Sequence, residues 1–313
     1  MAMDSMESAI RKHGWGALLL EHARSHKSAA IGLGIALLGV LILLLQSLLQ
    51  VADGTAAPGL RLALIGGSAG FVTTALGALP ALVLRGLPQR LEDSLLGMAA
   101  GMMLAASAFS LLLPGLESGA SLLGSKPLGA GVVVIGMAFG VLLMLGLDAF
   151  IPHEHNKTGP CGPGYERCSR IWLFVFAIAV HNLPEGMAIG VSFSQADMSV
   201  GLPLTTAIAL QDIPEGLAVA LALRSAGFAP RFAVLVAIAT GLLEPVGALL
   251  GVGLSSGLAL AYPMGLGLAA GAMIFVVSHE VIPETHRNGH QTPATLGLMV
   301  GFALMMVLDT ALG

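Results

Sequence analysis

The chain carries two related stretches, AVHNLPEGMAIG at residues 179–190 and ALQDIPEGLAVA at residues 209–220. Each lies within a long apolar run and brings a proline, a glycine and a carboxylate to the middle of that run. A charged side chain at the centre of a bilayer costs about 2.5–3.5 kcal/mol on insertion scales, so acids at that depth are usually functional. The function of the chain thus depends on whether these runs cross a membrane and on what their acids bind.

The composition indicates an integral membrane protein. Of the 313 residues, 56% are hydrophobic and 10% are charged, whereas a typical soluble domain has about 25% charged residues. A transmembrane helix needs about 20 apolar residues. The sequence contains nine such runs, at 29–51, 60–84, 91–113, 128–151, 171–193, 200–223, 232–254, 258–281 and 294–312. Because glycine is abundant and favours close helix packing, we expect an all-α protein with about nine transmembrane helices.

The positive charges divide unevenly between the predicted loops. With nine spans, twelve of the 14 lysines and arginines fall on the side of the N-terminus, and two, Arg61 and Lys126, fall on the other. Positively charged loops tend to stay in the cytoplasm, so we expect a plasma (inner) membrane protein with its N-terminus inside and its C-terminus outside. Residues 1–28 are then a cytoplasmic segment and 29–51 an additional span, ahead of an eight-helix domain at 60–312.

One long cytoplasmic loop, residues 152–170, contains histidines together with Cys161 and Cys168. It could bind metal or be merely solvated, because its C-x6-C spacing is a weak signal beside a true zinc knuckle. The two cysteines share one loop, so no disulfide framework holds the fold. We expect divalent metal ions and the lipid bilayer as partners, and no nucleic acid. A homodimer is left open.

Polar residues converge at one depth in three predicted spans. His181 lies ten residues into its span, and Asp212 and Glu244 each lie twelve residues into theirs. At a rise of about 1.5 Å per residue, all three lie about 15–18 Å deep, near the midplane. Glu185 and Glu215 are also deep, and no lysine or arginine lies at comparable depth to neutralise them. These acids therefore need either protons or a bound cation.

Helical spacing places the polar residues of each stretch on one face. His181 and Glu185 are four residues apart, and so are Gln211 and Glu215. Side chains at this spacing are neighbours on a helix surface. The prolines Pro184 and Pro214 free backbone carbonyls one turn earlier. Gly186 and Gly216 let a neighbouring helix approach closely. The two stretches therefore predict a cation site between their helices.

The ligand types narrow the choice of cation. Carboxylates and amides alone suit Mg²⁺ or Ca²⁺, but an added imidazole favours Zn, Fe, Mn, Co or Cd. Four acids in a small volume could neutralise two divalent ions, with Glu185 and Glu215 bridging them. The alternative is a purely structural role, in which the acids join helices by hydrogen bonds. This is the less common role of intramembrane acids.

The chain resembles the ZIP family of divalent-metal transporters, in particular its bacterial branch. The resemblance rests on HNLPEGMA, QDIPEGLA and the EP of GLLEPVGA, and it covers residues 60–313. It implies uptake of zinc, and also of cadmium, iron or manganese, into the cytoplasm, with the metal as transported substrate. It also implies two inverted three-helix repeats around a central kinked helix pair.

The resemblance further implies two metal sites with shared bridging acids. The first site comprises Met103, His181, Glu185, Gln211 and Glu215. The second site comprises Asn182, Glu185, Asp212, Glu215 and Glu244. The position of Met103, twelve residues into span 91–113, agrees with a midplane ligand, although a methionine in an apolar core is usually a space-filler.

Polar residues near the inner ends of two spans suggest an exit route for the ion. They are Asp148, His279, Glu280 and Glu284. His279 and Glu280 still lie within an apolar run, which favours function over an ordinary polar helix end.

Two other functions compete with uptake. An intramembrane metal-dependent hydrolase would also place histidine and acids at the midplane, but it needs an open metal position and a general base, and HEVIPETH does not match H-E-x-x-H. A cation-coupled exporter could use the same ligand set. The sequence has no nucleotide-binding motif, so we expect no direct drive by ATP. We expect a transporter and not an enzyme.

Overall fold

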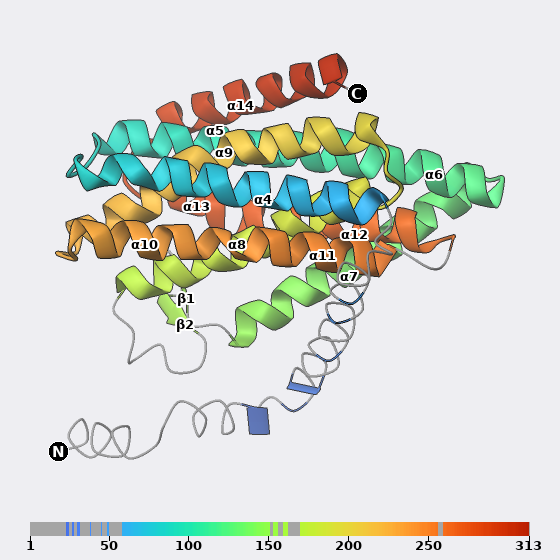
Figure 1. Ribbon diagram of the computed structural model, residues 1–313, viewed down its shortest axis with the longest axis horizontal. Helices are drawn as coiled ribbons and strands as arrows, with labels where there is room; N and C mark the ends of the chain where they lie inside the picture. The colour runs from blue at the N-terminus through green and yellow to red at the C-terminus, as the bar shows by residue number, and fades with distance from the viewer. Residues whose placement is uncertain are drawn as a thin grey trace.

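The computed structural model describes residues 58–150, 153–155, 159–161, 170–255 and 259–312, with isolated positions between residues 23 and 49. Within these residues, long helices run side by side along the long axis of the molecule (Figure 1). Seven described segments are long and apolar enough to cross a membrane: Pro58–Leu82, Gln89–Leu123, Lys126–Leu147, Met198–Ser225, Pro230–Ser255, Ala261–Thr285 and Gln291–Leu312. Helix α8, Arg170–Phe193, is a further helix of 24 residues. The chain is a multi-pass membrane protein.

The helices follow the apolar runs that predicted them. In chain order they are α4 (Pro58–Ala78), the 3-10 turn η1 (Leu79–Leu82), α5 (Gln89–Ala106), α6 (Leu113–Leu123), α7 (Lys126–Phe150), α8, α9 (Met198–Ser225), α10 (Pro230–Gly241), α11 (Leu243–Ser255), α12 (Ala261–Val276), α13 (Ile282–Thr285) and α14 (Gln291–Leu312). The predicted segment 1–28 and span 29–51 fall outside the described residues apart from isolated positions. The count of nine spans therefore stays a prediction.

One predicted boundary is wrong by about three turns of helix. The span predicted at 91–113 continues to Leu123, because a π-helical segment, η2 (Ser107–Leu112), links α5 to α6. Pro114 does not end the helix because it lies in the first turn of α6, where a proline is tolerated. A second π-helical segment, η4 (Val277–Val281), links α12 to α13 in the same way.

The loop at 152–170 is not wholly irregular, which modifies the all-α expectation. Residues His153–His155 (β1) and Gly159–Cys161 (β2) pair as short antiparallel strands, with His153 opposite Cys161. The three residues between the strands are a usual length for a hairpin connection. The hairpin lies beside the first half of α8 (Figure 1).

Close helix packing at the two repeated stretches is confirmed. A Cβ atom on Gly186 of α8 would overlap the backbone carbonyl oxygen of Glu244 in α11. A Cβ atom on Gly216 of α9 would overlap the carbonyl oxygen of Thr74 in α4. Small residues at such positions allow helix backbones to meet. The acids of α8 and α9 are thereby brought against two further helices.

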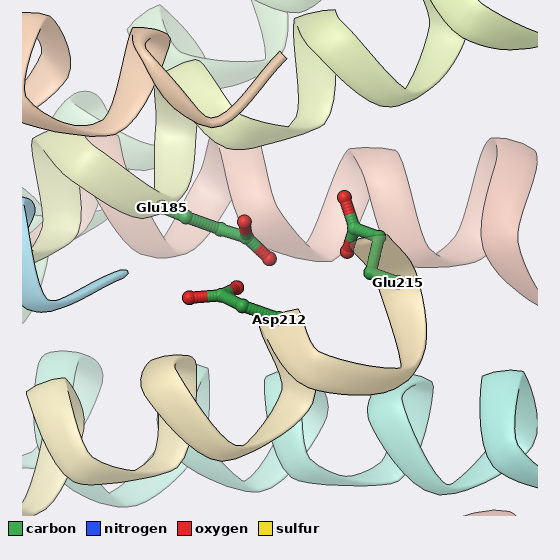
Figure 2. Close-up of side chains that lie close together, drawn as sticks. All are labelled: Glu185, Asp212 and Glu215. Carbon is green, nitrogen blue, oxygen red and sulfur yellow. The ribbon is translucent and has the colours of Figure 1, made fainter. Parts of the chain in front are cut away.

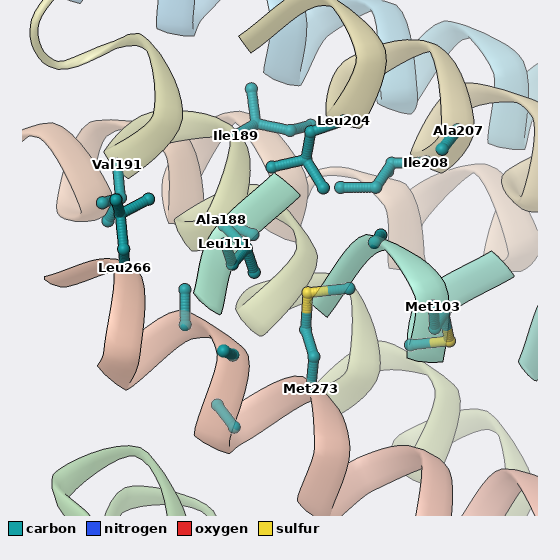
Figure 3. Close-up of a cluster of buried hydrophobic side chains, with 14 of the residues drawn as sticks. Met103, Leu111, Ala188, Ile189, Val191, Leu204, Ala207, Ile208, Leu266 and Met273 are labelled. Carbon is teal, nitrogen blue, oxygen red and sulfur yellow. The ribbon is translucent and has the colours of Figure 1, made fainter. Parts of the chain in front are cut away.

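Two apolar clusters lie on either side of the polar residues in the repeated stretches. On α8, Ile178 belongs to one cluster and Ala188 to the other. On α9, Ile208 belongs to the cluster of Ala188, and Val219 belongs to the cluster of Ile178. Figure 3 shows the cluster of Ala188 and Ile208. The polar residues between these positions therefore form a layer with apolar packing on both sides.

Candidate metal centre

Three carboxylates meet in the polar layer between α8 and α9. One oxygen from each of Glu185, Asp212 and Glu215 lies within 4.8 Å of the others, and all three residues are buried. Figure 2 shows the carboxylates of Glu185 and Asp212 facing the same space, with Glu215 one turn further along α9. Two oxygens bound tetrahedrally to one zinc ion would lie roughly 3.4 Å apart. A small inward movement of the three carboxylates would therefore bring their oxygens to the spacing of ligands on one zinc ion.

These carboxylates lack the partners that a purely structural role would need. Among the described residues, no lysine or arginine forms an ion pair with Glu185, Asp212, Glu215 or Glu244. Six buried side-chain oxygens in this part of the chain have no hydrogen-bond partner, and five belong to predicted ligands: Asn182 Oδ1, Glu185 Oε2, Gln211 Oε1, Glu215 Oε1 and Glu244 Oε2. A buried acceptor without a donor is costly. A bound cation would satisfy all five.

Gln211 orients one of the carboxylates. Its Nε2 donates a hydrogen bond to Glu185 Oε1 in a short contact. This bond leaves Glu185 Oε2 and Gln211 Oε1, both buried, as acceptors without a donor. The amide therefore fixes the Glu185 carboxylate and keeps its own oxygen available as a ligand.

Glu244 joins the group from a different helix. It lies in the first turn of α11, where the helix dipole favours a negative charge. A Cβ atom on Gly70 of α4 would overlap Glu244 Oε2 and lie 3.1 Å from Asp212 Oδ2. The Asp212 and Glu244 carboxylates therefore meet over the same glycine.

His181 connects this group to a residue predicted for the exit route. Its Nε2 lies 3.1 Å from Oε2 of Glu280, and His181 is buried. Glu280 belongs to the π-helical segment η4, which brings it to His181. The predicted midplane ligands and the predicted exit residues, which the sequence placed at different depths, are therefore in contact through this pair.

The other predicted exit residues occupy distinct positions. The ring of His279 lies against Phe275, with 4.8 Å between the ring centroids. Glu284 forms an ion pair with Arg287 at 3.0 Å, one turn along the helix end. Asp148 lies in α7, but its side chain is outside the described part of the structure.

Met103 is buried in the apolar cluster that also contains Ile208 and Met273 (Figure 3). This is the environment expected of a space-filling methionine. Its thioether role at the first metal site stays a prediction.

Three residues of α4 that the sequence did not single out line the same polar layer. Thr74 donates to Glu244 Oε1 at 2.9 Å, Thr73 contacts Asp212 Oδ2 at 3.3 Å, and Gly70 lies beneath both carboxylates. Glycine and threonine are common in apolar helices, so nothing in the sequence distinguished these positions from packing residues.

Known proteins are similar to this chain over most of its length. A family model described as "ZIP Zinc transporter" matches residues 152–309. A protein of Bordetella bronchiseptica named zinc transporter ZIPB is 62% identical over 291 residues, which cover 93% of this chain and 94% of the relative. Zinc transporter GufA of Myxococcus xanthus is 42% identical, covering 82% of this chain and all but 1% of its own length.

The similarity extends to animals. Human zinc transporter ZIP11 is 30% identical to this chain, covering 77% of it and 94% of the human protein. Both the family model and the bacterial relatives include the helices that carry the buried acids. The chain belongs to the ZIP zinc transporter family.

Proposed function

We propose that this protein carries zinc across the plasma (inner) membrane into the cytoplasm through a centre for two metal ions. The observation that carries the proposal is the set of five unpartnered, buried oxygens on predicted ligands, which come from α8, α9 and α11. A site of this kind between apolar clusters marks an ion pathway, because unpaired acids at that depth are otherwise unfavourable. Relatives named as zinc transporters support zinc as the cargo. Cadmium, iron and manganese suit the same ligands.

The two ions would share the bridging acids Glu185 and Glu215. The first would lie toward His181, Gln211 and Met103. The second would lie toward Asn182, Asp212 and Glu244, on the side of α4. His279 and Glu280 of η4, with Asp148 and Glu284 nearer the cytoplasm, would then receive the ion from the first site.

Helix packing supports an inverted repeat around the centre. Helix α4 packs along α9 as α11 packs along α8, and α5 packs along α14 as α12 packs along α7. A π-helical segment follows both α5 and α12. Such symmetry is expected where α4–α7 and α10–α14 are repeats of opposite orientation, with the binding site at their interface.

Flux measurements separate this function from the two alternatives. Purified protein in liposomes should carry zinc down an imposed gradient, and this flux would argue against a hydrolase. Oriented vesicles with gradients of either direction then distinguish uptake from export. A faster flux from the outer to the cytoplasmic face supports uptake, whereas flux only outward, driven by an opposing cation, would support the exporter. Absence of any zinc flux would contradict both transport functions.

A further inference from the structure

Helix α4 forms a wall of the candidate centre without contributing any acid. It packs against α8, α9 and α11, the three helices that carry the carboxylates. One turn of α4, from Gly70 to Thr74, faces them. Within this turn, Gly70 and Thr74 contact Glu244, and Gly70 and Thr73 lie beside Asp212.

Thr74 selects which oxygen of Glu244 is left available. Its Oγ1 lies 2.9 Å from Glu244 Oε1 and 3.2 Å from the carbonyl oxygen of Gly70. A hydroxyl has a single proton to donate, and the carboxylate is the closer acceptor. The buried Oε2 of Glu244 has no partner. Thr74 therefore holds one oxygen while the other is left for an ion.

Gly70 provides the space that this arrangement needs. A Cβ atom at this position would overlap Glu244 Oε2 and would also lie 3.1 Å from Asp212 Oδ2. Any side chain here would therefore displace the oxygen that Thr74 leaves available. The two residues, four positions apart on one face of α4, act on the same carboxylate.

Thr73 has a smaller part. Its hydroxyl lies 2.8 Å from the carbonyl oxygen of Gly70 and 3.0 Å from that of Ala69, both closer than Asp212 Oδ2 at 3.3 Å. The backbone is the nearer acceptor, so Thr73 is a secondary contact.

We propose that Gly70 and Thr74 are positioning residues that set the affinity of the second metal site. The inference rests on the proposed two-ion function. Both residues contact Glu244, which in the proposed centre ligates only the second ion. Hydrogen-bond partners of metal ligands typically change metal affinity by about 10–100-fold. Loss of the Thr74 hydroxyl should therefore weaken the binding of the second ion and leave the binding of the first ion unchanged.

The test compares zinc binding to the full-length wild-type protein and its variants by equilibrium titration. Thr74→Val keeps the shape of the side chain and removes the hydroxyl, whereas Thr74→Ser keeps the hydroxyl and removes the methyl group. We expect Thr74→Val to bind the second zinc ion about 10–100-fold more weakly, and Thr74→Ser to restore it. A matched control is Thr240→Val, since the buried Thr240 hydroxyl donates to the carbonyl oxygen of Ala237 at 2.7 Å. This control should bind both ions normally.

Gly70→Ala gives the same readout without altering a hydroxyl. It should lose the second ion, while Gly131→Ala on α7, where an added Cβ meets nothing within 4 Å, should bind both. Wild-type affinity for the second ion in Thr74→Val or Gly70→Ala would overturn the inference, as would equal loss in Thr74→Val and Thr74→Ser. Fewer than two zinc ions bound to the wild-type protein would instead contradict the two-ion function itself, and the inference with it.

Discussion

At the scale of single residues, two carboxylates of the candidate centre share one arrangement. One oxygen of each accepts a hydrogen bond, and the other oxygen is left free to bind an ion. Gln211 donates to Oε1 of Glu185, and Thr74 donates to Oε1 of Glu244. In both acids Oε2 is buried without a partner. Hydrogen bonds of this kind orient ligands before the ion arrives. The centre therefore offers directed oxygens and not merely a concentration of negative charge.

Glu185 and Glu215 should be indispensable because each would ligate both ions. Glu185→Gln and Glu215→Gln keep the size of the side chain and remove the charge. Zinc flux into liposomes should therefore fall by more than the roughly 10–100-fold that loss of a hydrogen-bond partner of a ligand typically costs. Thermal unfolding in detergent should show that both variants remain folded. Flux at the wild-type rate in either variant would exclude a bridging role for that residue.

Asp212 should affect only one of the two ions. Asp212→Ala removes a ligand of the second site and leaves His181, Gln211 and both bridging acids in place. We therefore expect a zinc titration to fall from two bound ions to one. A variant that binds no zinc would show that the two sites cannot be occupied independently.

The sequence predicted which residues gather, but not how they contact one another. Deep acids at helical spacing indicated the group of Glu185, Asp212 and Glu215, which the structure brings together. The contact between His181 and Glu280 was not predictable, because depth along a span was estimated from regular helical rise, and η4 departs from it. The bond from Gln211 to Glu185 depends on the relative rotation of two helices, which spacing within one helix does not determine.

At the scale of elements, apolar runs located the helices because a bilayer allows few other structures. The exception was the helix that continues through Pro114. A proline in an apolar run can end a helix or begin its next turn, and the sequence does not distinguish these cases. The hairpin at 153–161 was missed because short polar strands have no apolar alternation to reveal them.

Close packing between helices can be tested on α7. One of its glycines lies against a neighbouring helix, and another faces open space. A Cβ atom on Gly140 would overlap the carbonyl oxygen of Leu268 in α12, whereas one on Gly131 would meet nothing within 4 Å. Gly140→Val should therefore destabilise the protein by about 1–3 kcal/mol, the usual cost of overpacking. Gly131→Val should have little effect. Thermal unfolding of both variants in the same detergent measures the difference, and equal stability would contradict the α7–α12 packing.

At the scale of the whole molecule, the polar layer lies between two apolar clusters. In the proposed function, a zinc ion passes through this layer as it crosses the membrane. The direction of passage depends on orientation, and the proposed orientation rests on the distribution of lysine and arginine.

Orientation can be measured with a membrane-impermeant thiol reagent on intact cells. The native Cys161 and Cys168 lie in a loop predicted to be cytoplasmic, so the wild-type protein should not react. In a background with both cysteines replaced by serine, Lys126→Cys, at the exposed first residue of α7, should react from outside. Labelling of the native cysteines but not of the introduced one would reverse the assigned topology.

Anomalous X-ray diffraction from zinc-loaded crystals at the zinc absorption edge would locate the ions of the proposed two-metal centre. We expect two peaks between α8 and α9, both adjoining Glu185 and Glu215. One should lie toward His181 and Gln211, and the other toward Asp212 and Glu244, beside α4. Zinc peaks confined to other parts of the molecule, such as the loop at 152–170, with none between α8 and α9, would contradict the proposed centre.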